Sequence, residues 1–327
     1  MSQRRPALGL GVALVSSAAF ATSGAFAKSL LLGGWSPGAV VTLRIGIAAL
    51  VLLVPTLLSL RGRWPLLRRN APLVLGYGLT AVAGAQLAYF NAVTHLSVGV
   101  ALLLEYLAPV LIVGWLWVRH RQAPRRLTLI GVALALLGLL LVLDLTGGAR
   151  ISAVGVAWGL MAAVCLVVYF LLSAKTADAL PAIALAGSGL IVGAIVLGLA
   201  GATGILEMTR GASVVEIGST PAPWWVPILV VSIVAAAFSY VAGVAAVRML
   251  GAKVSSFVSL TEVLFAIIFA WLVLGELPMP VQLLGGALII GGVVAVRADE
   301  LRGVRARRAE RHTDEVAQPA THGALSG

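Results

Sequence analysis

The chain has 327 residues, of which 60% are hydrophobic and only 11% are charged, and its mean hydropathy is +1.05. A soluble domain would carry about a quarter charged residues, so the composition excludes a water-soluble protein. The net charge of +11 is spread over short polar segments and a tail, which argues against a nucleic-acid-binding surface, and a single cysteine, Cys165, excludes an internal disulfide.

Ten apolar runs follow in chain order, and each is long enough to cross the hydrocarbon core of a bilayer. The predicted spans are 7–27, 36–59, 71–94, 97–118, 126–145, 152–173, 181–202, 224–247, 253–274 and 280–297. We further predict a cytoplasmic N-terminus over 1–6, an ordered or semi-ordered external loop over 204–223 and a disordered cytoplasmic tail over 298–327. The fold class is therefore an all-α membrane protein.

The first span imitates a secretion signal, because Arg4 and Arg5 precede an apolar stretch that ends in Ala25-Phe26-Ala27. Nine further spans follow it, and its Gly11-Val12-Ala13 recurs later as Gly155-Val156-Ala157. We therefore expect a retained first helix, although the sequence leaves open whether it is ever cleaved.

Lysine and arginine predict the orientation, since cytoplasmic loops of membrane proteins are rich in both. With the N-terminus inside, nineteen of these residues fall in cytoplasmic segments, whereas only Lys28, Arg150 and Arg210 fall outside. The count predicts a multi-pass protein of the cell (inner or plasma) membrane with both termini in the cytoplasm.

The chain also resembles itself at an offset of 154 residues. Leu127, Gly131, Ala133, Leu134 and Gly138 match Val281, Gly285, Ala287, Leu288 and Gly292. Each repeat holds five spans, an odd number, so the second copy must enter the membrane from the opposite side. The basic loop 119–126 accordingly becomes 273–280, which carries no positive charge. We predict two inverted five-helix repeats, 7–145 and 152–297, around a central cavity, an arrangement typical of secondary transporters.

Both halves resemble the EamA domain of the drug/metabolite transporter superfamily. The resemblance is carried by Arg44 in the second span, Pro109-Val110 in the fourth and Leu274-Gly275-Glu276 at the end of the ninth. The stretch from Glu105 to Pro109 is also similar to the threonine and homoserine exporter branch, whereas Glu262-Val263 stands where the family has Glu-Pro. The resemblance implies a cavity lined by spans 1–4 and 6–9, with spans five and ten packed outside.

Three charged residues, Arg44, Glu105 and Glu262, lie deep inside predicted spans, where such groups are costly and usually face a cavity or a partner. Arg44 and Glu105 both lie about 12 Å below the external ends of their helices, so we predict an ion pair between them. In the repeat frame the two acids are three positions apart, on one helix face. Either acid could bind a substrate ammonium or a coupling proton, or Glu105 could simply neutralise Arg44.

Polar and aromatic residues complete the predicted substrate or proton pathway. They are Gln86, Tyr89, Asn91, Trp158, Tyr169 and Tyr240. Gln86 and Tyr240 are equivalent in the two repeats, whereas Trp158, Cys165 and Tyr169 form a helical stripe of a kind that is more often packing than the wall of a binding site. Two glycine pairs seven residues apart, in spans five and ten, predict close helix packing.

We expect a secondary active transporter that exports amino acids or related small metabolites by alternating access. The alternatives are a multidrug or cation, sugar or lipid-precursor transporter of the same fold, and a membrane sensor or structural protein. The four histidines are scattered and no His-Glu-x-x-His, Gly-x-Ser-x-Gly or phosphate-binding loop occurs, so we predict no enzyme, cofactor or metal. The expected partners are a small-molecule substrate and the lipid bilayer, not nucleic acid; a coupling proton and a homodimer are left open.

Overall fold

The structure is a computed structural model that describes residues 6–96, 98–120, 124–142, 152–175, 180–274 and 280–317. The elements of the first half are α1 (Pro6–Leu32), α2 (Pro37–Leu60), α3 (Trp64–Arg69), α4 (Ala71–Gly76), η1 (Tyr77–Gly84), α5 (Ala85–His95), α6 (Val98–Glu105), α7 (Ala108–His120) and α8 (Arg126–Val142). The second half holds α9 (Ala153–Lys175), α10 (Ala182–Ala202), β1 (Val214–Ile217), β2 (Thr220–Pro223), α11 (Trp225–Leu229), η2 (Val230–Phe238), α12 (Ser239–Leu250), α13 (Ala252–Ser259), α14 (Thr261–Leu274) and α15 (Pro280–Ala317).

Within these ranges, six helical segments are long and apolar enough to cross a membrane. They are Ala7–Leu32, Pro37–Leu60, Ala71–Ala92, Ala153–Lys175, Ala182–Ala202 and Trp225–Leu250. Shorter apolar helices, Ala108–Arg119, Arg126–Leu141 and Leu283–Val296, fall in the predicted spans four, five and ten. The chain is therefore a multi-pass membrane protein.

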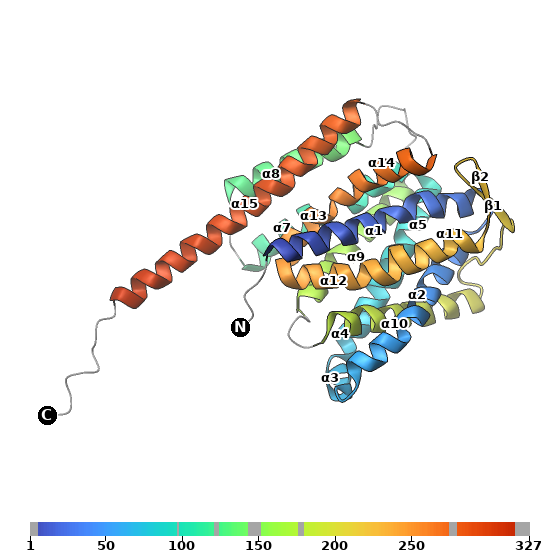
Figure 1. Cartoon of the computed structure of the whole chain (residues 1–327), viewed down its shortest axis with the longest axis horizontal. Helices are drawn as coiled ribbons and strands as arrows, with labels where there is room; N and C mark the ends of the chain where they lie inside the picture. The colour runs from blue at the N-terminus through green and yellow to red at the C-terminus, as the bar shows by residue number, and fades with distance from the viewer. Residues whose placement is uncertain are drawn as a thin grey trace.

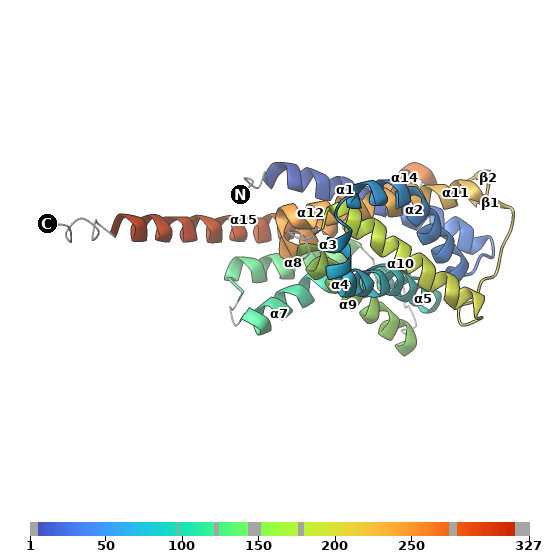
Figure 2. The ribbon, with the colours of Figure 1, turned by 90° about the horizontal axis from the view of Figure 1, so that it is seen from below.

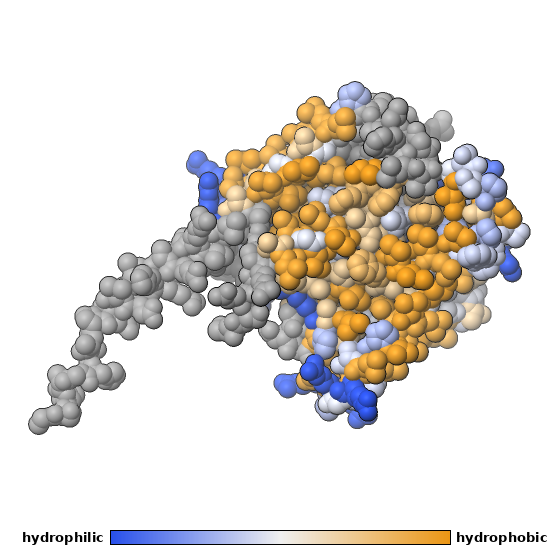
Figure 3. Space-filling view, viewed as in Figure 1, coloured by the Kyte–Doolittle hydropathy of each residue, from blue (hydrophilic) through white to orange (hydrophobic). Residues whose placement is uncertain are grey.

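The helices form one bundle, with the β1–β2 hairpin at one end and both the start of α1 and the end of α15 toward the other (Figures 1 and 2). Figure 3 shows hydrophobic residues over the flank of the bundle and hydrophilic residues gathered at its ends. Among the exposed hydrophilic residues are Arg61, Arg63, Arg68 and Arg69, next to α3. The largest buried cluster joins α2, η1, α10 and η2.

The third and eighth predicted spans contain π-helices at matching places in the two halves. The third runs from α4 through η1 to α5, and the eighth runs from α11 through η2 to α12. Shifting η1 by 154 residues gives 231–238, which falls inside η2 (Val230–Phe238). A π-helix has wider turns than an α-helix and commonly marks a functional position. The internal repeat therefore extends from the sequence to an irregularity of the backbone.

The fourth predicted span is broken at Tyr106, and the ninth is broken at Leu260, which lies 154 residues later. Pro109 accounts for the first break, because its nitrogen carries no hydrogen to donate to the carbonyl of Glu105. The two halves thus share the site of the break, although only the first half has the proline.

Hydroxyl groups account for the second break. Ser256, Ser259 and Thr261 donate hydrogen bonds of 2.8, 2.8 and 2.7 Å to the carbonyls of Lys253, Ser256 and Val258, each three residues earlier. Side-chain bonds of this kind compete with the backbone ladder and bend helices. The N–H of Leu260 turns to the carbonyl of Phe257, at 3.2 Å. The ninth span therefore breaks without the Glu-Pro that the family resemblance led us to expect.

Helices α8 and α15 lie side by side at one flank of the bundle (Figure 1). A Cβ added at Gly131 would lie 2.8 Å from the carbonyl oxygen of Gly292, and one added at Gly292 would lie 2.7 Å from that of Gly131. A Cβ added at Gly138 would lie 2.5 Å from the carbonyl oxygen of Gly285. The predicted close packing is confirmed, and its reciprocity is that expected of two elements related by a two-fold axis.

The described part of α15 continues to Ala317, so residues 298–317 are helical and the predicted disordered tail is corrected there. Alanine, arginine and glutamate dominate this segment, and all three favour helix. Asp299, which we placed in the tail, is buried: it accepts a hydrogen bond from Thr128 (2.6 Å) and lies 3.7 Å from the ammonium of Lys253. Residues 318–327 lie outside the described ranges.

The predicted external loop 204–223 is ordered and contains the antiparallel hairpin, paired from Val214↔Pro223 to Ile217↔Thr220. It packs on the turn between α1 and α2. The indole of Trp35 donates to the carbonyl of Ala212 at 3.2 Å, and its ring lies 5.0 Å from that of Trp224. The hairpin therefore ties the loop between α10 and α11 to the first half of the chain.

Candidate functional site

A cavity of about 330 Å³ lies between the two halves, within the size range of small-molecule sites. Its polar and aromatic lining comprises Ser16, Ser17, Phe20, Ser23 and Lys28 of α1, Arg44 of α2, Gln86, Tyr89 and Phe90 of α5, Glu105 and Tyr106, Tyr169 and Phe170 of α9, Tyr240 of α12, Ser255 and Ser259 of α13, and Glu262 of α14. All predicted spans that the resemblance assigns to the lining contribute except the seventh, since no residue of α10 reaches the cavity among the described residues. Helix α10 packs behind α2 and η1 instead.

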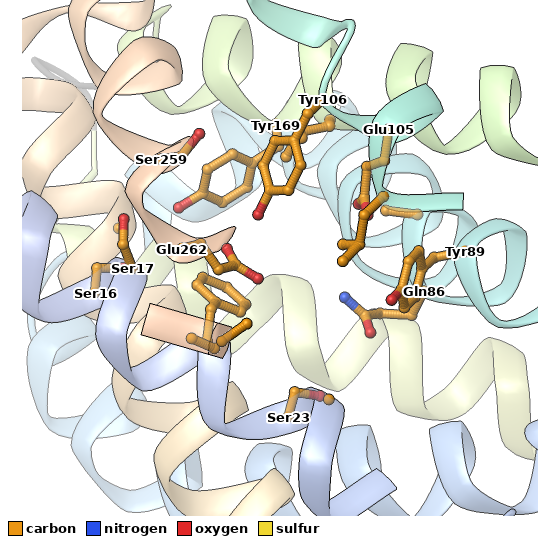
Figure 4. A pocket seen from close by; sticks show the side chains of 18 of the residues that line it. Ser16, Ser17, Ser23, Gln86, Tyr89, Glu105, Tyr106, Tyr169, Ser259 and Glu262 are labelled. Atoms are coloured by element: carbon orange, nitrogen blue, oxygen red, sulfur yellow. The ribbon is translucent and has the colours of Figure 1, made fainter. Parts of the chain in front are cut away.

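Two carboxylates face the cavity from opposite sides (Figure 4). Glu105 ends α6, immediately before the break at Tyr106. Glu262 lies in the first turn of α14, immediately after the break at Leu260, where the positive end of the helix dipole favours a negative charge. The hydroxyl of Tyr106 lies beside the Glu262 carboxylate. Each helix break therefore delivers one acid to the cavity.

Arg44 is only 2% exposed and is held by neutral acceptors. Its Nη1 donates to Ser23 Oγ (2.8 Å) and Gln86 Oε1 (3.0 Å), and its Nη2 donates to the carbonyl of Ala235 (2.8 Å). The ion pair that we predicted with Glu105 is not formed; among the described residues the one ion pair joins Lys253 and Asp299. Equal depth in the membrane did not predict the partner of Arg44, because three acceptors from α1, α5 and η2 already occupy both terminal nitrogens of the guanidinium.

Aromatic rings form a continuous cluster along one side of the cavity. The ring of Tyr240 packs edge-on against Phe20 (5.3 Å between centroids) and Tyr169 (5.9 Å), and Tyr169 packs on Phe170 (5.1 Å). The hydroxyl of Tyr240 donates to the carbonyl of Ala81 at 3.2 Å. The cluster gives the cavity a largely apolar surface beside its two acids.

The structure brings seven of the nine predicted pathway residues to the cavity. They are Arg44, Gln86, Tyr89, Glu105, Tyr169, Tyr240 and Glu262. Asn91 and Trp158 lie outside the lining; the Asn91 amide donates to the carbonyl of Leu87 within its own helix, at 2.8 Å. Trp158 shares a stripe with Tyr169, but only the Tyr169 end of the stripe reaches the cavity.

Sequence reasoning did not select the serines of α1. Ser16 and Ser23 are seven residues apart, and both line the cavity. That spacing places two residues on one helix face, so a pair of serines at this spacing in a largely apolar span was a usable signal. Among the described residues no three His, Cys, Asp or Glu side chains gather to hold a metal ion.

Comparisons with known proteins agree with this arrangement. The EamA-like transporter family matches residues 7–144 and again residues 153–298. A solved structure, described as the crystal structure of a protein, is 17% identical, with a TM-score of 0.71 over 88% of this chain and 96% of that chain. At this identity the likeness concerns the fold alone. No curated protein matches the chain.

Proposed function

This chain belongs to the EamA-like transporter family and is a multi-pass membrane transporter; we propose that it exports amino acids or related small metabolites by secondary active transport. In this proposal ten helices cross the cell membrane as two inverted five-helix halves, with both termini in the cytoplasm. Inverted halves allow two conformations of similar energy, open to opposite sides, and a substrate in the central cavity would be exposed to each side in turn.

The observation that carries the proposal is the pair of carboxylates without a cationic partner. Glu105 and Glu262 both line the cavity, yet no ion pair reaches either acid among the described residues. Arg44 donates to neutral groups. A carboxylate away from water is costly unless it is paired or protonated. A ligand with an ammonium group, or a coupling proton, would supply the missing positive charge.

The rest of the lining suits the other parts of an amino acid. Phe20, Tyr169 and Tyr240 offer an apolar wall for a side chain. Lys28 lines the cavity toward the hairpin end of α1, where its ammonium could meet a carboxylate. An amphipathic zwitterion therefore finds complementary groups on three sides, which supports this substrate class over a sugar or a lipid precursor.

The proposal is tested with purified protein in lipid vesicles that are given a panel of labelled amino acids, with and without a pH gradient. We expect flux of at least one amino acid above protein-free vesicles, and acceleration by the gradient if a proton is coupled. Glu105→Gln should lower the flux at least about tenfold, because a charge-assisted contact is worth ~1.5–3 kcal/mol. Glu216→Gln, at an exposed hairpin carboxylate, is the matched control. Parental flux in Glu105→Gln would remove Glu105 from the mechanism.

One alternative of the same fold has an observation in its favour. Aromatic rings beside two acids are also a suitable site for an organic cation, through cation–π contacts. A quaternary ammonium compound without a carboxylate therefore belongs in the same vesicle panel. Flux of that cation without flux of any amino acid would replace the amino-acid proposal with a cation exporter.

A further inference from the structure

The two π-helices are joined by polar groups that cross between the halves of the chain. Nη2 of Arg44, in the first half, donates to the carbonyl of Ala235 in η2, at 2.8 Å. The hydroxyl of Tyr240, in the second half, donates to the carbonyl of Ala81 in η1, at 3.2 Å. Ala81 and Ala235 differ by 154 residues, the offset of the internal repeat. Each half thus holds the wide turn of the other at the same structural position.

Gln86 connects the two crossings. Its Oε1 accepts from Arg44 at 3.0 Å, and its side chain lies beside the Tyr240 hydroxyl. Gln86 and Tyr240 are themselves equivalent in the repeat. The result is one chain of contacts from Ala235 through Arg44, Gln86 and Tyr240 to Ala81, with equivalent carbonyls at its two ends. Contact between equivalent residues places this chain at the pseudo-two-fold axis.

The backbone carbonyls at the two ends suit this role. A carbonyl oxygen has two lone pairs, so it can accept a second hydrogen bond besides the one within its helix. The carbonyl of Ala235 accepts from two side chains, Arg44 Nη2 at 2.8 Å and Ser239 Oγ at 2.7 Å. Arg44 and Tyr240 are each only 2% exposed, so water competes little for these contacts. Both crossings join the moving parts of a two-state transporter, in which the two halves must change their relative position.

We propose that Arg44 and Tyr240 are positioning residues: through Gln86 they form a crossed brace that holds the two π-helices in the arrangement seen here. The brace must open when the cavity becomes accessible from the other side. This inference rests on the proposed alternating access, and it assigns Arg44 and the hydroxyl of Tyr240 to the conformational equilibrium, whereas the ring of Tyr240 remains part of the apolar wall of the cavity. The Arg44 link is the stronger one, because its donor is charged and its contact is shorter.

The brace is tested by the access of a thiol reagent to the two ends of the cavity. Cys165 is the single native cysteine, so a Cys165→Ala chain can carry one reporter at a time. Leu31→Cys and Ala13→Cys place reporters on α1, in the cavity lining and eighteen residues apart. The ratio of their labelling rates by a charged maleimide, measured in detergent so that both ends are reachable, reports which arrangement is populated.

Tyr240→Phe removes one hydroxyl and keeps the aromatic ring that packs against its neighbours. We expect it to raise labelling of the less reactive reporter relative to the other by about fivefold, the factor that a hydrogen bond of ~1 kcal/mol represents. Arg44→Lys keeps the charge, but a lysine cannot reach Gln86 and Ala235 together. We expect this variant to raise the relative labelling of the less reactive reporter about tenfold or more. The control is Ser232→Ala, which deletes a buried bond to the carbonyl of Ile228 within the same span and should leave the ratio unchanged.

A ratio that stays at the parental value in folded Tyr240→Phe and Arg44→Lys would overturn the brace. If Arg44→Lys does not fold, the labelling ratio of Tyr240→Phe alone tests the brace, because this variant loses only one hydroxyl and should fold. An equal shift in Ser232→Ala would assign the effect to general loosening of the eighth span and would also overturn the inference. The labelling needs no substrate, so a failed transport panel with a shifted ratio would reject the proposed substrate and retain the brace.

Discussion

Helices α8 and α15 are uninterrupted, whereas the segments that carry most of the cavity's polar groups are widened or broken at η1, Tyr106, η2 and Leu260. The α8–α15 pair meets through glycines, whose backbones approach closely only if both helices are regular. In a bilayer, irregular backbone is tolerated where it is buried in protein or lines a cavity. The contrast separates a rigid flank from the irregular segments in which we place the functional movements.

The largest expected effect comes from breaking the rigid flank. In Gly138→Leu the new Cβ would lie 2.8 Å from the backbone nitrogen of Ile289 and still closer to the carbonyl of Gly285. The helices must separate, so we expect a loss of ~3 kcal/mol or more in the free energy of unfolding. Denaturant unfolding and the amount of folded protein in the membrane measure it.

Gly198→Leu is the control for that variant, because a Cβ at Gly198 meets nothing within 4 Å. This substitution replaces a poor helix former by a good one. Equal destabilisation by Gly138→Leu and Gly198→Leu would show that the α8–α15 contact is not special.

A second prediction concerns the acid delivered by the broken ninth segment. Glu262→Gln keeps the shape of the side chain but removes its charge, so the substrate concentration at half-maximal flux should rise about tenfold to 100-fold, corresponding to ~1.5–3 kcal/mol. Concentration series in vesicles check this. A lower maximal rate at unchanged half-saturation would instead give Glu262 a role in the conformational step.

An intermediate effect is expected where the rigid flank touches a broken segment. Asp299 of α15, Thr128 of α8 and Lys253 of α13 form one buried polar cluster. Asp299→Asn leaves the Lys253 ammonium without its counter-charge, and partial exposure of Lys253 limits the cost to ~2 kcal/mol of unfolding free energy. Glu207→Gln, an exposed carboxylate near the hairpin, should change the same measurement by less than ~0.5 kcal/mol.

The smallest expected effect tests the cause of the helix break at Leu260. Thr261→Val removes the hydroxyl that donates to the carbonyl of Val258 and keeps the side chain's shape. We expect a change of only ~0.5–1 kcal/mol in stability, together with slower amide exchange over 260–265 as the helix becomes more regular. Faster exchange there would mean that the hydroxyl holds the turn rather than disturbing the helix.

The sequence was sufficient for features that depend on composition along one segment. Apolar runs located the helices, and charge at depth selected Glu105 and Glu262 before their positions in space were known. It was insufficient where the outcome depends on several segments at once. Arg44 pairs with neutral groups on α1, α5 and η2, and no one-dimensional depth estimate could show that these acceptors lie nearer than Glu105.

Of the irregular backbone segments, too, only some could be predicted from the sequence. The break in the fourth span could be predicted from the sequence, because Pro109 marks it. The break in the ninth span results from the combined hydroxyls of Ser256, Ser259 and Thr261. The π-helices carry no single diagnostic residue. Their equivalence became visible only once the repeat offset could be applied to the backbone.

Pro109 also has a consequence for hydration. It deprives the carbonyl of Glu105 of the amide that would pair with it in a continuous helix, and lipid cannot supply a donor. Water molecules in the cavity can donate to this carbonyl, so the break favours a hydrated cavity when no solute is bound. A solute that displaces this water must itself donate a hydrogen bond to the Glu105 carbonyl, or it loses affinity.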